Sequence, residues 1–142
     1  MTFPVEMSRS FEARSEGVSA FLSFFEEWAD DHDLSPTVAT PLQLMLDEWL
    51  TNVATHGYSG RGGPVEVKVC CGSPDRAEVW VTDAAAPFDP HDAPVPDTTR
   101  SLEDRPVGGL GIHFIRRMAS RLEYRRVGEQ NQLHLVREVP AT

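Results

Sequence analysis

Apolar residues recur along this chain with two periods, and each period predicts one kind of element. Between Val18 and Ala29 they recur at spacings of three and four, which predicts a helix that begins near Ser15, a residue able to cap it. A second helix is expected to begin at Ser35 and Pro36, because serine suits the cap and proline the first helical position. A third, shorter helix is expected around the apolar residues Leu110, Phe114, Ile115 and Met118.

Alternation of apolar and polar residues predicts the strands. It indicates a first strand around residues 3–7, then a hairpin with strands at residues 65–71 and 77–81 and a turn at residues 72–75. A closing hairpin is expected within residues 122–139. The order strand, helix, helix, two strands, helix, two strands favours an α/β (α+β) two-layer sandwich. In that fold, one mixed, mostly antiparallel sheet has helices on one face.

Residues 84–107 separate the second hairpin from the third helix and show no apolar period. They hold five of the eleven prolines, and little burial is expected to hold them in place. A structureless stretch of this length is uncommon inside a compact domain and is often a functional lid. We therefore predict a lid at residues 84–107 within a single domain that spans residues 1–142.

Composition narrows the class of protein. A chain of 142 residues with 40% apolar and 25% charged residues suits one soluble globular domain. No run of about 18 apolar residues is present, so we expect no membrane-spanning helix. The start of the chain lacks the features of a signal peptide. Cys70 and Cys71 are neighbours in a predicted strand and point to opposite faces, which disfavours a mutual disulfide. We expect a cytoplasmic location.

The formal net charge of −9 argues against nucleic acid as a partner. The charge is uneven, because residues 1–104 carry 19 acids and 6 bases, whereas residues 105–142 carry 3 acids and 7 arginines. A positive potential around the second part would suit a triphosphate. For most of these arginines, an exposed solubilising role explains the pattern equally well.

Spacings of four place Glu48, Asn52 and His56 on one stripe of the second helix. An asparagine oxygen is a hard ligand of the kind that Mg²⁺ accepts, and a carboxylate can orient or deprotonate a nucleophile. The same pattern fits a solvated helix face that ends in a histidine. Two later features favour a functional site: Asp83 ends a predicted strand, and a glycine-rich turn at residues 105–111 opens a helix.

A helix with Glu-x-x-x-Asn, a strand that ends in Asp and a Gly-Gly-Leu-Gly turn that enters a helix resemble, in this order, the GHKL (histidine-kinase-like) ATPase superfamily. The chain length and the run Leu-Asp-Glu-Trp-Leu-Thr-Asn-Val-Ala-Thr-His-Gly-Tyr are most similar to its small branch, the anti-sigma-factor serine/threonine-protein kinases. The similarity runs from about residue 10 to the C-terminal strand. It implies the Bergerat ATP-binding fold, ATP and Mg²⁺ as cofactors, and protein kinase activity.

The resemblance also implies roles for single residues. Glu48 would be the catalytic carboxylate and Asn52 the Mg²⁺ ligand, while Asp83 would accept a hydrogen bond from the adenine amino group. Ala85 stands where the family motif has its first glycine. Its methyl group could crowd the adenine, and alanine would be strained if that position needs a positive φ.

The phosphates would be bound near the glycine-rich turn, because backbone amides at a helix N-terminus attract anions. Arg105 is a candidate for the terminal phosphate, although a surface arginine would look the same. His56 could help to hold the phosphates or the lid, and a histidine that only packs at the end of a helix would show the same pattern. The residues that we expect near the phosphates are His56, Arg105, Gly108, Gly109, Leu110 and Gly111.

The resemblance names partners as well. It implies a STAS-domain anti-sigma-factor antagonist as the phosphorylated protein, a sigma factor as the protein held inactive, and a possible homodimer. Transcription would then be regulated by partner switching. Two alternatives stay open: a non-catalytic ATP-gated protein-binding module, and a degenerate module that no longer binds nucleotide.

Overall fold

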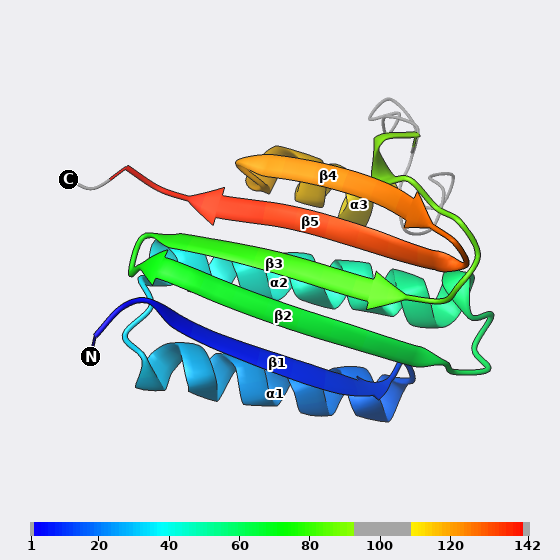
Figure 1. Ribbon diagram of the computed structural model, residues 1–142, viewed down its shortest axis with the longest axis horizontal. Helices are drawn as coiled ribbons and strands as arrows, with labels where there is room; N and C mark the ends of the chain where they lie inside the picture. Colours follow the sequence, from blue (N-terminus) through cyan, green and yellow to red (C-terminus); the bar gives the residue numbers. More distant parts are fainter. Residues whose placement is uncertain (1, 93–108, 141–142) are drawn as a thin grey trace.

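The computed structural model describes residues 2–92 and 109–140. Five strands form one sheet in the order β1-β2-β3-β5-β4, and all four pairings are antiparallel (Figure 1). The predicted two-layer α+β sandwich is therefore confirmed, and the described part of its sheet contains no parallel pair. The strands are β1 (Val5–Glu12), β2 (Pro64–Ser73), β3 (Arg76–Asp83), β4 (Arg121–Val127) and β5 (Gln130–Glu138).

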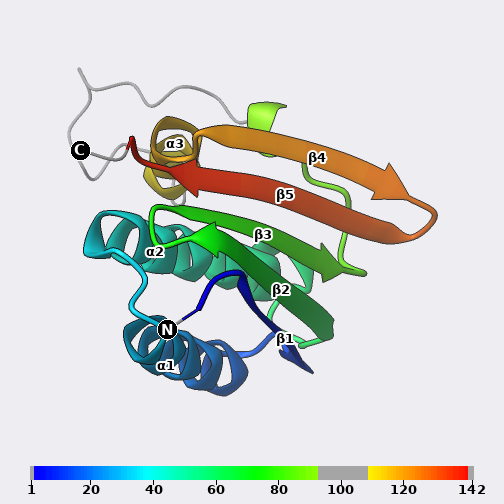
Figure 2. The same ribbon diagram turned by 60° about the vertical axis from the view of Figure 1, so that its left-hand side comes forward.

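Three α-helices cover one face of the sheet and leave the other face open (Figures 1 and 2). They are α1 (Ser15–Asp31), α2 (Pro36–Asn52) and α3 (Gly109–Met118), and two short turns accompany them, the π turn η1 (Val53–Gly57) and the 3-10 turn η2 (Pro90–Asp92).

The helix starts follow the sequence signals closely, with one correction. Ser35 occupies the capping position before α2 and Pro36 is the first helical residue, as predicted. Ser15, however, is the first residue of α1 and not its cap; Arg14 holds the capping position in an extended conformation. Ala13, the residue before Arg14, is still hydrogen-bonded to the chain just ahead of β2, because its amide donates to the Gly63 carbonyl at 2.8 Å. The helix therefore begins only after Arg14.

Alternation along the central strands separates the core from solvent. In β2 and β3, every second residue lies under the helices and is buried, and each large apolar side chain contributes about 1.5–3 kcal/mol when it leaves water. Cys71 belongs to this inner row and Cys70 to the outer row, and both thiols are free, as predicted. Burial raises the pKa of Cys71 to about 12.

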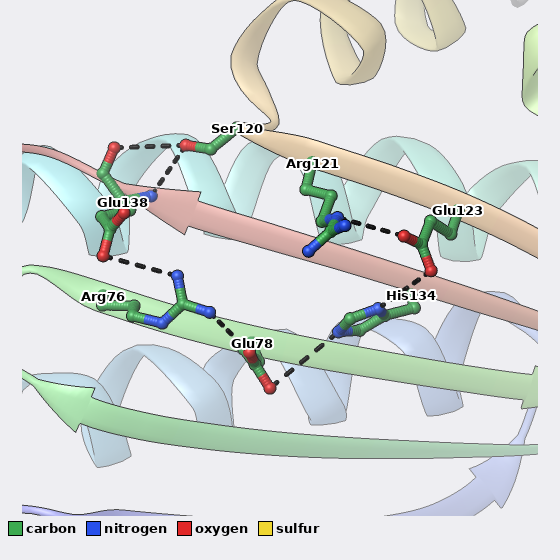
Figure 3. Close-up of polar contacts among 7 residues, drawn as sticks. All are labelled: Arg76, Glu78, Ser120, Arg121, Glu123, His134 and Glu138. Atoms are coloured by element: carbon green, nitrogen blue, oxygen red, sulfur yellow. Dashed lines mark hydrogen bonds and ion pairs between the residues drawn. The ribbon is translucent and has the colours of Figure 1, made fainter.

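The open face of the sheet is polar. The register aligns Ser8, Lys68, Trp80, His134 and Glu123 in one row across all five strands. The Trp80 and His134 rings stack with centroids 4.9 Å apart. Figure 3 shows the ion pairs at one end of this row, where His134 lies between Glu78 and Glu123.

Among the described residues, none of the helices is both long enough and apolar enough to cross a bilayer.

Candidate functional site

The end of α2 places Glu48 against the first turn of α3. A Cβ atom added to Gly111 would lie 2.8 Å from Cδ of Glu48 and closer still to Oε2. Only glycine therefore leaves room for this carboxylate. Glu48 and Gly111, which the sequence analysis assigned to one site, do lie side by side in the fold.

The glycine-rich turn differs from the prediction in where the helix begins. α3 begins at Gly109, so Gly109, Leu110 and Gly111 form its first turn and do not precede it. The first amides of a helix have no carbonyl partner within the helix, and together they attract anions. Arg105 and Gly108 lie outside the described residues.

The α-helix that carries the predicted stripe ends at Asn52. Asn52 is the last α-helical residue, half-buried and one turn after Glu48. The next five residues form the π turn η1, in which the Tyr58 amide bonds to the Val53 carbonyl at 2.8 Å. His56 therefore lies in a π turn and not in the α-helix that the spacing argument assumed. His56 is exposed, and its role in the site stays a prediction.

Asp83 is a buried carboxylate at the end of β3, with 3% of its surface exposed. Its Oδ1 accepts hydrogen bonds from the Ala85 amide at 2.9 Å and from Nδ2 of Asn131 at 2.8 Å. Within the described residues, every hydrogen bond to this carboxylate ends on Oδ1. Burial raises the pKa of Asp83, while the two donors and the positive charge of Arg126 oppose that rise.

Asn131 is the residue that the sequence analysis missed. It faces Asp83 across the β3–β5 pairing and is 3% exposed. Its amide also donates to the carbonyls of Ala85 and Ala86 at 3.2 and 3.1 Å. Its Oδ1 accepts from the hydroxyl of Tyr124 and from Nη1 of Arg126. The available signal was a carboxamide in the inward-facing row of β5, two residues before Leu133.

The backbone of Ala85 is free of the positive-φ strain that the sequence analysis considered for this position. Its backbone is not in the positive-φ region, which among described non-glycine residues holds only Asp33 and Ser59. The left-handed strain is therefore absent. A Cβ atom on Gly57 would lie 2.8 Å from the Ala85 methyl carbon. The methyl group thus packs against the π turn, at a place where a glycine makes room for it.

Tyr58 fastens the chain beside Asp83. Its hydroxyl accepts a hydrogen bond from the Ala84 amide and donates one to the Pro64 carbonyl, both at 2.7 Å. Burial is the largest cause of the raised pKa of Tyr58, so the phenol stays protonated and keeps donating.

The first part of the predicted lid is anchored. The Phe88 ring stacks on buried Trp49 with centroids 5.9 Å apart, and Pro90 is buried. Nε2 of His91 lies 3.0 Å from the Leu122 carbonyl. Ala85 and Pro90 are buried, but six of the nine residues 84–92 are exposed, so the expectation of little burial holds for most of this part. Residues 93–107 of the predicted lid lie outside the described residues.

Together these contacts place three kinds of group around the ends of β3 and α2. The buried Asp83 offers an acceptor, the first turn of α3 offers amides, and Glu48 offers an exposed carboxylate beside that turn. The Gly57–Ala85 contact joins the end of β3 to the end of α2. Such an arrangement can bind a polar base at one end and an anion at the other.

Comparison with known proteins finds relatives for most of the chain. Residues 11–137 match a family described as the histidine kinase-like ATPase domain. The serine/threonine-protein kinase BtrW of Bordetella bronchiseptica is 32% identical over 95 residues, which are 66% of this chain and 66% of that protein. The match therefore spans about two thirds of this relative.

Two solved structures share the fold at low sequence identity. The RsbU and RsbW domains of a Mycobacterium tuberculosis protein superpose with a TM-score of 0.64 and 12% identity, over 97% of this chain and 35% of that one. The histidine kinase domain of a blue-light activated histidine kinase from Erythrobacter litoralis gives a TM-score of 0.50 and 15% identity, over 85% of this chain and 60% of that one.

Proposed function

This chain belongs to the histidine kinase-like ATPase domain family, and from this premise we propose that it is an ATP-dependent serine/threonine-protein kinase of the anti-sigma-factor type. One observation carries the proposal: the Glu48 carboxylate lies against Gly111 in the first turn of α3. A carboxylate that can accept a hydroxyl proton is thereby beside amides that can bind phosphate. The similarity to BtrW, named as a serine/threonine-protein kinase, supports the reaction class.

Asp83 is proposed to select adenine. Asn131 and the Ala85 amide occupy Oδ1, so Oδ2 is the oxygen that we assign to the exocyclic amine of the base. A buried acceptor discriminates strongly against a base with a carbonyl oxygen at that position, because two acceptors would then meet without a proton. Ala85, whose methyl packs on Gly57, is assigned to the wall of the same pocket.

Asn52 is proposed as the protein ligand of Mg²⁺. Among the described residues, no group of three or more histidine, cysteine or acidic side chains could hold a metal ion. A lone amide oxygen fits Mg²⁺, which keeps several waters and takes further ligands from phosphates. His56, Arg105 and the Gly108–Gly111 turn are proposed to bind the phosphates.

Glu48 is proposed to orient the serine or threonine hydroxyl of a protein substrate and to accept its proton. Bound ATP and Mg²⁺ would supply the transferable phosphoryl group and the neutralising charge. As partners we propose a STAS-domain antagonist as the substrate and a sigma factor as the protein held inactive, with a homodimer as the assembly. These partners rest on the resemblance to anti-sigma-factor kinases.

The first experiment separates nucleotide binding from phosphoryl transfer. We expect calorimetry to detect ATP binding that requires Mg²⁺ and exceeds GTP binding. Glu48→Gln should keep that affinity and lose phosphorylation of a STAS-domain partner, whereas Asn52→Ala should lose the Mg²⁺ dependence. Asp47→Asn is the matched control, since Asp47 is an exposed neighbour whose carboxylate, among the described residues, accepts a hydrogen bond from Thr51 alone. ATP binding without transfer in the wild type would favour the ATP-gated binding module.

A second experiment tests the contact that carries the proposal. Gly111→Ala places a methyl group on the position of Glu48 Oε2, which is the far end of a flexible, exposed side chain. Glu48 can swing away, so we expect a small change in the unfolding midpoint and a loss of transfer similar to that of Glu48→Gln. A fully active Gly111→Ala variant would disprove the role of this contact.

A further inference from the structure

A groove of about 860 Å³ runs between α1 and α2 on the outer side of the helical layer. Small side chains, among them Ala29 and Ala39, line the groove and leave the space between the two helices unfilled. Gln43 closes the floor by donating to the Leu22 carbonyl at 3.2 Å. The groove involves the second half of α1 and the first half of α2, and Glu48 and Asn52 follow in the second half of α2.

Leu44 lines this groove and is 50% exposed. It is the most exposed of the three large apolar side chains that the described residues leave open, the others being Val127 at 44% and Phe88 at 36%. Leu34 adds a buried apolar surface to the lining. The groove therefore offers an apolar contact that nothing in the described fold covers.

Carboxylates line the α1 side of the groove. Glu26, Glu27 and Asp30 are exposed, and none of them forms an ion pair within residues 2–92 and 109–140. They lie towards the C-terminal end of α1, where negative charge opposes the helix dipole and where the last turn contains no basic residue. The stability of α1 thus gives no reason for their placement.

The segment around the groove, residues 15–60, carries acidic side chains and no lysine or arginine. It contains eight carboxylates, which are Glu16, Glu26, Glu27, Asp30, Asp31, Asp33, Asp47 and Glu48. An apolar groove at the centre of such a field is complementary to a cationic surface with an apolar stripe.

We propose that the α1–α2 groove binds a basic amphipathic helix of a partner protein. Its apolar stripe would pack on Leu44 and the groove floor, and its lysines or arginines would lie along Glu26, Glu27 and Asp30. A third helix fits between two neighbouring helices at an interaxial distance of about 8–10 Å, and an amphipathic helix in a groove is a common recognition mode.

A second copy of this chain is a poorer occupant. Its cations are concentrated in α3 and β4, where Ile112 and Ile115 are buried in its own core and Phe114 and Met118 pack against that core. Among the residues of that surface whose exposure is described, Val127 is the one large apolar side chain left open, which is too little for an apolar stripe. The groove contains none of the residues assigned to the nucleotide, although Leu44 lies one helical turn before Glu48, so the proposal does not depend on ATP binding.

The test uses a fluorescein-labelled synthetic helix with a leucine face and a lysine face, and a second peptide in which glutamate replaces every lysine. We expect anisotropy to show binding of the lysine peptide only. The double variant Glu26→Lys/Glu27→Lys should bind it about tenfold more weakly. The matched control Glu66→Lys/Glu129→Lys, which changes the net charge equally at exposed sites on β2 and in the β4–β5 turn, should keep the wild-type affinity.

Leu44→Ser tests the apolar contact and should weaken binding about fivefold. Circular dichroism confirms that each surface variant is folded. Equal weakening by the groove variant and the control variant would mean attraction to net charge alone and would overturn the proposal. Absence of lysine-peptide binding to the wild type would overturn it as well. If sedimentation then showed self-association that only the groove variants abolish, a second copy would be the occupant instead.

Discussion

Strands β3 and β5 carry a polar pair on each face of the sheet, and the two pairs are built differently. On the helix-covered face, Asp83 and Asn131 are each 3% exposed and joined by a 2.8 Å hydrogen bond. On the open face, the side chain of His134 is 25% exposed and lies 4.0 Å from a carboxylate oxygen of Glu78 and 3.8 Å from one of Glu123 (Figure 3).

The difference shows where this fold accepts an energetic cost. A buried carboxylate loses its hydration and must be compensated by donors, so the inner pair is stable only as a complete network. An apolar pair at the same register would pack without that requirement. On the open face, the carboxylates of Glu78 and Glu123 are 30% and 52% exposed, so water screens their contacts with His134 and these contribute little, although Nε2 of His134 is itself buried and has no hydrogen-bond partner among the described residues. A costly polar pair at a strand end is the kind of feature that function explains better than stability does.

The largest effect is expected for Asn131→Leu. The substitution removes a donor to Asp83 and to the Ala85 and Ala86 carbonyls and leaves a buried carboxylate under-compensated. We expect the free energy of unfolding in urea to fall by about 3 kcal/mol. Gln132→Leu, one residue along on the open face, is the control and should change it by less than about 0.5 kcal/mol. Equal effects would abolish the contrast between the two faces.

A second, smaller effect concerns the wall beside the inner pair. Gly57→Ala would bring two methyl carbons to 2.8 Å, so the π turn or the segment after β3 must shift. We expect a loss of about 1–3 kcal/mol, most of which the double variant Gly57→Ala/Ala85→Gly should recover.

Gly72→Ala is the control for this pair, because nothing lies within 4 Å of the added Cβ atom. Thermal unfolding of Gly57→Ala, Ala85→Gly, the double variant and Gly72→Ala measures the coupling. If Ala85→Gly failed to rescue Gly57→Ala, the methyl contact would not be the source of the loss.

The sequence predicted those features whose signals are local. Helix and strand periods, the Ser35-Pro36 start of α2 and the strand-end position of Asp83 all depend on residues near one another. The partnership of Asp83 with Asn131 joins residues 48 positions apart and depends on strand register, which one inward-facing carboxamide does not reveal. The π turn and the Gly57–Ala85 contact were missed for the same reason, since neither has a repeating pattern of its own.

Asp83→Asn should raise stability at neutral pH while it weakens nucleotide binding. Burial raises the folded-state pKa of Asp83 above its ordinary value of 3.8, so the protonated form stabilises the fold and that contribution is lost as pH rises through the folded pKa. Asparagine keeps an acceptor oxygen and never ionises. The gain over wild type should therefore be present near neutral pH and shrink as pH falls through the raised pKa.

Urea unfolding of both proteins across this pH range measures the gain, and calorimetry measures ATP affinity. Wild type more stable than Asp83→Asn at neutral pH would show that the donors around Oδ1 outweigh the loss of hydration. In that case the ionised carboxylate of Asp83 would itself stabilise the fold, and function would no longer be needed to explain the buried pair of Asp83 and Asn131.

The smallest effect is expected on the open face. The Glu123 side chain is 52% exposed, pairs with Arg121 at 3.0 Å and faces His134 only at 3.8 Å. Glu123→Gln keeps the shape and removes the charge, so the free energy of unfolding should change by less than about 0.5 kcal/mol, and by less still in about 1 M salt, where screening acts over about 3 Å. The ring stack of His134 on Trp80 does not involve this carboxylate, so Trp80 fluorescence should stay unchanged. A loss comparable with that of Asn131→Leu would mean that the outer row is a cooperative network, and that exposure does not separate the two faces as argued.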